Sequence, residues 1–234
     1  MKKTKKRPRI DPLEIHRLLS AHFGPLHWWP GETPFEVMVG AILTQNTAWT
    51  NVEKAIAALQ AEGLLSPPAL AAADPDLLRR CIRPSGYYNQ KAERLALFVR
   101  WLLDEWRGNL DVLRRADTAD LRQRLLALKG IGPETADSIL LYALDHPAFV
   151  IDAYTRRIFS RLGLTAPDAS YDELQEWFVS RLPADRALYN ELHAQIVFLG
   201  KDFCRKEPRC EACPLRLICK ETPAIKKGKK RQSP

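Results

Sequence analysis

The residues best suited to chemistry are cysteines near the end of the chain. Four of the five lie within sixteen residues, in the pattern C-x5-C-x2-C-x5-C. Thiolates crowded in this way, in a chain with no secretory signal, indicate a metal ion or an iron–sulfur cluster rather than disulfides. The spacing alone does not distinguish a zinc ion from an iron–sulfur cluster. Four-cysteine zinc sites usually show two C-x2-C pairs, whereas a cubane cluster suits wider loops. The predicted ligands are Cys204, Cys210, Cys213 and Cys219, whereas Cys81 is predicted to be a core residue.

A glycine-rich turn is the second candidate. Residues 128–136 read Leu-Lys-Gly-Ile-Gly-Pro-Glu-Thr-Ala and lie between two apolar stripes of helical spacing. Gly130 and Gly132 allow a tight turn, and Pro133 suits the first turn of the next helix. The amides at that helix start are able to hold a phosphate group, and a plain helix–helix turn is the alternative. No strand precedes the turn and Thr135 replaces a third glycine, so it is not a dinucleotide-binding motif.

The elements that must position these residues are helices. Apolar residues recur at helical spacing in most of the chain, and β-branched runs are scarce. Pro and Gly interrupt the stripes at short intervals, which predicts an all-α fold of roughly ten short helices. Asp117-Thr118 marks the start of the helix before the glycine turn. Asp152, about twenty residues after that turn, is by itself predicted to cap another helix.

Length and charge limit the function further. The 234 residues suffice for one sizeable core or two small lobes, and no stretch approaches the roughly 18 apolar residues that span a bilayer. Residues 2–9 and 222–234 hold eleven of the 36 basic side chains, which leaves 25 basic against 28 acidic residues elsewhere. The tails either bind phosphates by counterion release or are solubilising, disordered ends. With no apolar segment after the basic N-terminus, we expect a cytoplasmic protein, associated with the nucleoid if bacterial.

These motifs, taken in order, resemble the helix–hairpin–helix glycosylases of the endonuclease III superfamily. The resemblance covers about residues 12–220 and rests on the Gly-Ile-Gly turn, the Pro147 to Asp152 segment and the four-cysteine loop. It implies two lobes and a 4Fe–4S cluster. The six-helix barrel lobe would comprise residues 34–147, with the helix–hairpin–helix at about 121–144. The cluster-bearing lobe would comprise 11–33 and 148–221, between basic tails at 1–10 and 222–234.

The resemblance also implies a substrate and roles for particular residues. A monomer would bind double-stranded DNA containing a damaged base and flip the damaged nucleotide out of the helix. Asp152 matches the family's catalytic aspartate, whose charge would stabilise an oxocarbenium-like sugar and help to activate water. Gln45 and Ser85 lie in two loops that would probe the gap left by the base. The cluster loop would contact phosphates, with a solvated face as the alternative reading, through Lys201, Arg205, Lys206 and Arg209.

Two departures from the family pattern affect this reading. The first cysteine gap has five residues, where endonuclease III and the MutY-type adenine glycosylases have six. Bifunctional members carry a lysine just after the hairpin, whose amine forms a Schiff base with the sugar. Here Glu134 stands at that position, and a carboxylate cannot form this imine. Lys129 lies on the other side of the turn, so the sequence predicts a monofunctional, hydrolytic glycosylase.

Tryptophans near the N-terminus point to the substrate. Trp28-Trp29-Pro30 and the Trp49 segment are similar to the 3-methyladenine glycosylase branch of the superfamily. Trp28 and Trp49, with Glu134, would form a base pocket whose indoles attract a cationic alkylated purine, and Trp29 is predicted to lie in the core. A core role for all three is the alternative. Two other functions also stay open: a bifunctional oxidised-pyrimidine glycosylase with AP lyase activity, and a non-catalytic, cluster-bearing DNA-binding module.

Overall fold

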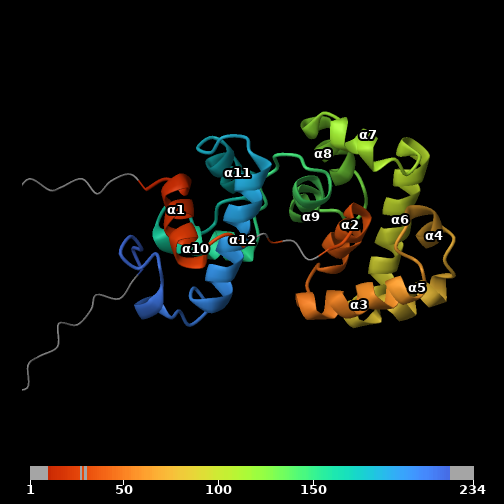
Figure 1. Ribbon diagram of the computed structural model, residues 1–234, viewed down its shortest axis with the longest axis horizontal. Coiled ribbons are helices and arrows are strands. Elements are labelled where there is room, and N and C mark those ends of the chain that lie inside the picture. The colour runs from red at the N-terminus through yellow and green to blue at the C-terminus, as the bar shows by residue number, and fades with distance from the viewer. Residues whose placement is uncertain (1–9, 27, 29–30, 222–234) are drawn as a thin grey trace, which may run out of the picture. The chain divides into compact units, whose positions relative to one another are not determined.

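The computed structural model describes residues 10–26, 28 and 31–221, and every regular element within those ranges is helical, as predicted (Figure 1). The predicted basic tails lie almost entirely within residues 1–9 and 222–234, which are outside the described ranges. Trp29 is also outside them. Across the described ranges, no helix combines the length and apolar character needed to span a membrane. The chain divides into two compact units. The central unit comprises residues 27–150 and 183–191, and the terminal unit comprises 1–26, 151–182 and 192–234.

The central unit is built around its longest helix, α6 (Tyr88–Trp106). Leu95, Phe98 and Leu102 recur at helical spacing along α6 and are fully buried, each contributing roughly 1.5–3 kcal/mol of burial free energy. α6 contacts α2, α4 and α5, so the core forms on this face. The other helical elements of the unit are α2 (Pro34–Leu43), α3 (Trp49–Ala61), α4 (Pro67–Ala71), α5 (Pro75–Ile82), η1 (Arg83–Ser85), α7 (Leu110–Arg115), α8 (Thr118–Leu126), α9 (Pro133–Ser138) and η2 (Ile139–Ala143).

Helix starts in this unit follow their side-chain caps. The Asp117 carboxylate accepts a hydrogen bond of 2.9 Å from the Asp120 amide, which confirms the predicted start of α8. The second apolar stripe, expected to be one α-helix, instead changes character after Ser138. Residues Ile139–Ala143 form a π-helical turn, in which the Leu144 amide donates to the Ile139 carbonyl oxygen at 3.2 Å. This wider turn alters which side chains of η2 face the core.

The terminal unit packs α10 (Ala153–Leu162) with α1 (Pro12–Phe23), α11 (Tyr171–Val179) and the later part of α12 (Arg186–Asp202). Phe159 on α10 and Phe178 on α11 are fully buried, with ring centroids 4.6 Å apart. Gly200 on α12 lies against the Tyr154 ring, which any Cβ at that position would strike. A glycine is therefore required for α12 to approach α10 this closely. A short 3-10 turn, η3 (Cys210–Ala212), follows within the cysteine segment.

Candidate functional site

The hairpin joins α8 to α9 through a turn whose shape depends on Gly130. This residue has a φ of +88°, and a Cβ there would meet the Arg94 side chain at 2.5 Å. No L-residue with a side chain fits that position without moving Arg94. Gly132 precedes α9 with open space around its missing Cβ. The turn thus presents a bare backbone at the start of α9, as the sequence predicted from the Gly-Ile-Gly pattern.

A buried ion pair holds the two hairpin helices together. Arg122 on α8 donates two hydrogen bonds to the Asp137 carboxylate on α9, from Nε at 2.7 Å and from Nη2 at 3.1 Å. The Asp137 side chain is fully buried. A bidentate contact of this kind fixes both the spacing and the orientation of the helices that carry the turn.

Gln45, expected to probe the DNA, is bound to the hairpin in this structure. Its amide nitrogen donates to the Gly130 carbonyl oxygen at 3.0 Å and to the Thr135 hydroxyl at 2.9 Å. Arg94 donates to the Gln45 amide oxygen. The amide therefore ties the loop after α2 to the hairpin, and its predicted contact with DNA stays a prediction.

The turn between α5 and α6 exposes a different residue from the one expected. Ser85 is fully buried, and its hydroxyl donates to the Ile82 carbonyl oxygen at 2.7 Å. The Ser85 side chain is therefore turned into the protein, and the predicted contact of its loop with DNA stays a prediction. Tyr87, two residues later, is 66% exposed and has a φ of +47°. A large aromatic side chain displayed from a left-handed turn is a further candidate for contact with DNA, which the sequence motifs did not indicate, and the Gly86-Tyr87 pair was the available signal.

The two candidate pocket tryptophans are both half-buried in the central unit. Trp28 packs edge-to-face against Tyr142, with ring centroids 6.1 Å apart at 83°. Tyr142 lies on the π-helical turn η2, and the sequence pattern did not indicate it as a site residue. Trp49 begins α3 and packs its ring over Gly40 of α2, against the core. Trp49 thus has contacts of the kind expected of a core residue, whereas Trp28 belongs to an aromatic pair.

Glu134 and Lys129 take different positions around the hairpin. Glu134 is exposed in the first turn of α9, where a negative charge is favoured by the helix dipole. Lys129 is exposed before Gly130 and lines a shallow surface pocket with Arg94 and Glu93 of α6. The lysine nearest to the hairpin in sequence therefore lies beside α6.

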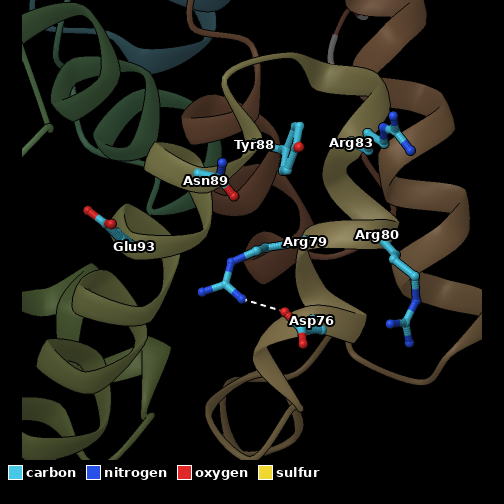
Figure 2. Close-up of a pocket in the computed structure, with 7 residues that line it drawn as sticks. All are labelled: Asp76, Arg79, Arg80, Arg83, Tyr88, Asn89 and Glu93. Carbon is cyan, nitrogen blue, oxygen red and sulfur yellow. Dashed lines mark hydrogen bonds and ion pairs between the residues drawn. The ribbon is translucent and has the colours of Figure 1, made fainter.

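A larger pocket of the central unit lies between α5, η1 and the start of α6 (Figure 2). It has a volume of about 620 Å³, and its charged groups do not converge. Arg79 points to Asp76, 2.6 Å away, while Arg80 points in another direction. An arrangement without convergent polar groups offers no means of orienting a base, so this pocket is not the candidate base site.

Asp152 caps α10, as its sequence context predicted. One oxygen, Oδ1, accepts hydrogen bonds from the Thr155 amide at 2.7 Å and from its hydroxyl at 2.8 Å. The other, Oδ2, lies 3.7 Å from Nε2 of His193 on α12. Only 13% of the Asp152 side chain is exposed. The carboxylate is held rigidly and its charge is stabilised by the start of the helix.

The cysteine segment is anchored to α10 by two arginines. Arg157 donates to the Cys204 carbonyl oxygen at 2.7 Å, and Arg161 donates to the carbonyl oxygens of Arg205 and Lys206 at 2.6 and 3.2 Å. Arg161 also lies 3.3 Å from the Cys204 sulfur. These contacts fix the backbone of the cysteine segment against α10.

All four predicted ligand cysteines are free and half-buried. Burial raises the pKa of Cys210, and the neighbouring thiols of Cys219 and Cys204 raise it further. Among the described residues, no three His, Cys, Asp or Glu side chains lie close enough to hold one metal ion. Four cysteine thiols carried by one short segment are the donor set that a four-thiolate cluster requires. The predicted phosphate contacts Lys201, Arg205, Lys206 and Arg209 are all exposed.

The family follows from comparison with known proteins. A model of the HhH-GPD superfamily of base excision DNA repair proteins matches residues 39–184. The chain therefore belongs to this superfamily, as the motifs predicted, and it is a DNA N-glycosylase. Over 208 residues it is 48% identical to the Methanocaldococcus jannaschii protein named "Putative DNA repair glycosylase MJ1434", covering 88% of this chain and 94% of that relative.

Two solved structures share the fold. The H. pylori 3-methyladenine DNA glycosylase MagIII, bound to 1,N6-ethenoadenine, is 31% identical with a TM-score of 0.73, covering 82% of this chain and 98% of that one. A trapped covalent complex of endonuclease III with DNA is 25% identical with a TM-score of 0.77, covering 91% and 97%. The fold is thus shared by enzymes with different substrates, and the residues of the site must distinguish between them.

Proposed function

We propose that this DNA glycosylase is monofunctional: it flips a damaged base out of double-stranded DNA and hydrolyses the N-glycosidic bond without cutting the strand. Glu134 carries this proposal, because it stands at the hairpin position where bifunctional members of the family have a lysine. A carboxylate cannot form the Schiff base that leads to strand cleavage. Lys129, the alternative amine, lies beside Glu93 and Arg94 of α6.

Asp152 supplies the electrostatic part of the reaction. As the glycosidic bond breaks, positive charge develops on the sugar, and a fixed carboxylate stabilises that charge without reorganising. The hydrogen bonds from Thr155 hold one oxygen in place before substrate arrives. The same carboxylate helps to orient the water that attacks the sugar.

Alkylated purines such as 3-methyladenine are the proposed substrates. Such bases carry positive charge and leave readily, so one carboxylate and a water suffice. Trp28, in its edge-to-face pair with Tyr142, would offer an indole face that attracts a cationic ring. Trp49 stays a predicted pocket residue, although its ring packs over Gly40 of α2. The 31% identity to the MagIII glycosylase supports this choice among the superfamily's substrates.

The cysteine segment would hold a 4Fe–4S cluster through Cys204, Cys210, Cys213 and Cys219. When bound, the cluster would supply structural cross-linking of the segment through four thiolate bonds. The segment's exposed cations, Lys201, Arg205, Lys206 and Arg209, would then contact DNA phosphates.

A lesion screen with the purified full chain tests the proposal. Duplexes containing one 3-methyladenine, one 1,N6-ethenoadenine or one thymine glycol are scored for base loss after alkali and for strand cleavage without it. We expect base loss from the alkylated adenines, little strand cleavage and little borohydride-trapped adduct. Efficient trapping would favour a bifunctional enzyme, and faster excision of thymine glycol would overturn the substrate assignment.

Variants then test the assigned residues. Asp152→Asn should reduce excision by about 10²–10³ while keeping affinity for lesion DNA, because the charge acts as the bond breaks. The exposed Asp168→Asn is the matched control. Trp28→Ala and Trp49→Ala should each reduce 3-methyladenine release by about 5- to 150-fold, which corresponds to roughly 1–3 kcal/mol of base stacking. Full activity of both tryptophan variants would contradict the pocket.

A further inference from the structure

The two oxygens of the Asp152 carboxylate have different surroundings. Oδ1 is occupied by the amide and hydroxyl of Thr155. Oδ2 faces the imidazole of His193, whose Nε2 lies 3.7 Å away. The helix cap thus uses one oxygen, and a second element, α12, presents a titratable ring to the other.

His193 is placed where a charge on its ring is disfavoured. Its side chain is 5% exposed, and burial lowers its pKa below the ordinary histidine value, although the Asp152 charge opposes that shift. A neutral imidazole can donate one N–H to a carboxylate while leaving the carboxylate's negative charge intact. A cationic partner would instead neutralise the charge on which the proposed reaction depends.

We propose that His193 is a positioning residue for Asp152, whose Nε2–H orients Oδ2 toward the reacting sugar. This inference rests on the proposed role of Asp152. The 3.7 Å separation is longer than a hydrogen bond, and catalytic contacts of this kind commonly shorten when substrate binds. Thr155 and His193 would together leave the carboxylate no rotational freedom, so that its charge is preorganised.

His146 in the central unit shows what a purely structural histidine looks like in this chain. It is also buried, but its two ring nitrogens lie 2.9 Å from the Thr118 hydroxyl and 2.9 Å from the Leu113 carbonyl oxygen. Its ring joins α8 to α7 through a hydroxyl and a backbone carbonyl oxygen. Replacing His146 therefore serves as the comparison for a loss of buried packing alone.

A double-mutant cycle tests the proposal. The single-turnover excision rate is measured for His193→Leu, His193→Gln, Asp152→Asn and the two double variants, together with affinity for abasic-site DNA. His193→Leu should lower the rate by about 10- to 100-fold with affinity unchanged, as for other residues that orient a reacting group. His193→Gln, which keeps an N–H donor, should recover most of that loss. In the Asp152→Asn background, neither substitution should lower the rate further.

The outcomes separate this inference from the proposed function. If His193→Leu lowers the excision rate equally in the Asp152 and Asp152→Asn backgrounds, His193 acts by supporting the fold and the proposal is overturned. His146→Gln is expected to show that behaviour. A fully active His193→Leu would also overturn the proposal. If His193→Leu fails to fold, as judged by thermal unfolding, His193→Gln carries the same cycle: a small loss of rate is expected with Asp152 present and none in the Asp152→Asn background, and an equal loss in both backgrounds would overturn the proposal. Full activity of Asp152→Asn would instead refute the proposed role of Asp152 itself.

Discussion

The ammonium group of Lys91 donates a hydrogen bond of 2.6 Å to the carbonyl oxygen of Ser85. It donates a second, of 2.8 Å, to the Leu43 carbonyl oxygen at the end of α2. Lys91 is 1% exposed, so it is a buried amine that joins the turn displaying Tyr87 to the loop that carries Gln45. Burial, and next the charge of Arg94, lower the pKa of Lys91 to about 8.

This pKa predicts a pH-dependent stability. Between about pH 8 and 10.5 the unfolded chain holds a proton on Lys91 that the folded chain has lost. The free energy of unfolding therefore rises with pH in that window, by up to about 1.4 kcal/mol per pH unit. Lys91→Met should lack this rise, whereas the exposed Lys54→Met should retain it. Urea unfolding at pH 7.5, 8.5 and 9.5 measures the difference, and parallel curves for the chain and Lys91→Met would contradict the prediction.

The hairpin should depend strongly on its buried ion pair. Arg122→Ala removes the bidentate cation from the fully buried Asp137 carboxylate, and breaking a buried ion pair in this way typically destabilises a protein by about 3–5 kcal/mol. Arg124→Ala on the same helix removes exposed contacts to Asp120 and Glu105 and a cation–π contact with Trp106, and it should change stability much less. Thermal and urea unfolding of the two variants should differ clearly, and an equal, small effect would show that Asp137 finds another partner.

Tyr87 should insert next to the flipped nucleotide. Stacking of an aromatic ring on a base contributes roughly 1–3 kcal/mol, so Tyr87→Ala should weaken binding to abasic-site DNA by about 5- to 150-fold. Tyr87→Phe should bind nearly normally, because the ring rather than the hydroxyl stacks. The exposed Val112→Ala is the control for a loss of surface apolar area. Fluorescence anisotropy checks the prediction, which fails if Tyr87→Ala binds as tightly as the unsubstituted chain.

The cysteine segment should contain iron and labile sulfide. A cubane held by four thiolates predicts a brown protein with about four irons per chain. Cys213→Ser should lose the colour and weaken DNA binding, whereas replacement of the buried Cys81 of the central unit by serine should keep both. Metal analysis with visible absorption decides the matter, because a colourless protein with one zinc would refute the cluster.

Sequence patterns predicted best those features that depend on local chemistry. Asp117 and Asp152 both cap helices, because a short carboxylate beside a helix start satisfies free amides wherever it occurs. The Gly130 turn was predictable for the same reason, since its φ excludes other residues. The all-helical class and the superfamily followed from spacing and from ordered motifs.

Features that depend on packing could not be predicted in this way. The π-helical turn at 139–143 has the same apolar spacing as an α-helix, so Tyr142 was not identified as the partner of Trp28. Ser85 is polar and lies in a turn, yet tertiary contacts bury it completely. The pairing of His193 with Asp152 joins residues 41 positions apart, and no periodicity indicates a contact at that separation.

Asp152 caps the N-terminus of helix α10, and Arg161 lies in its last turn. The helix cap and the anchor of the cysteine segment therefore belong to one continuous helix. At 1.5 Å per residue, about 14 Å of continuous helix separates them. A change in the cysteine segment would alter its hydrogen bonds to Arg157 and Arg161. Because both arginines lie on the helix that Asp152 caps, such a change would also shift the Asp152 carboxylate. Damage to the cysteine segment is therefore expected to displace the Asp152 carboxylate and to lower the proposed excision activity.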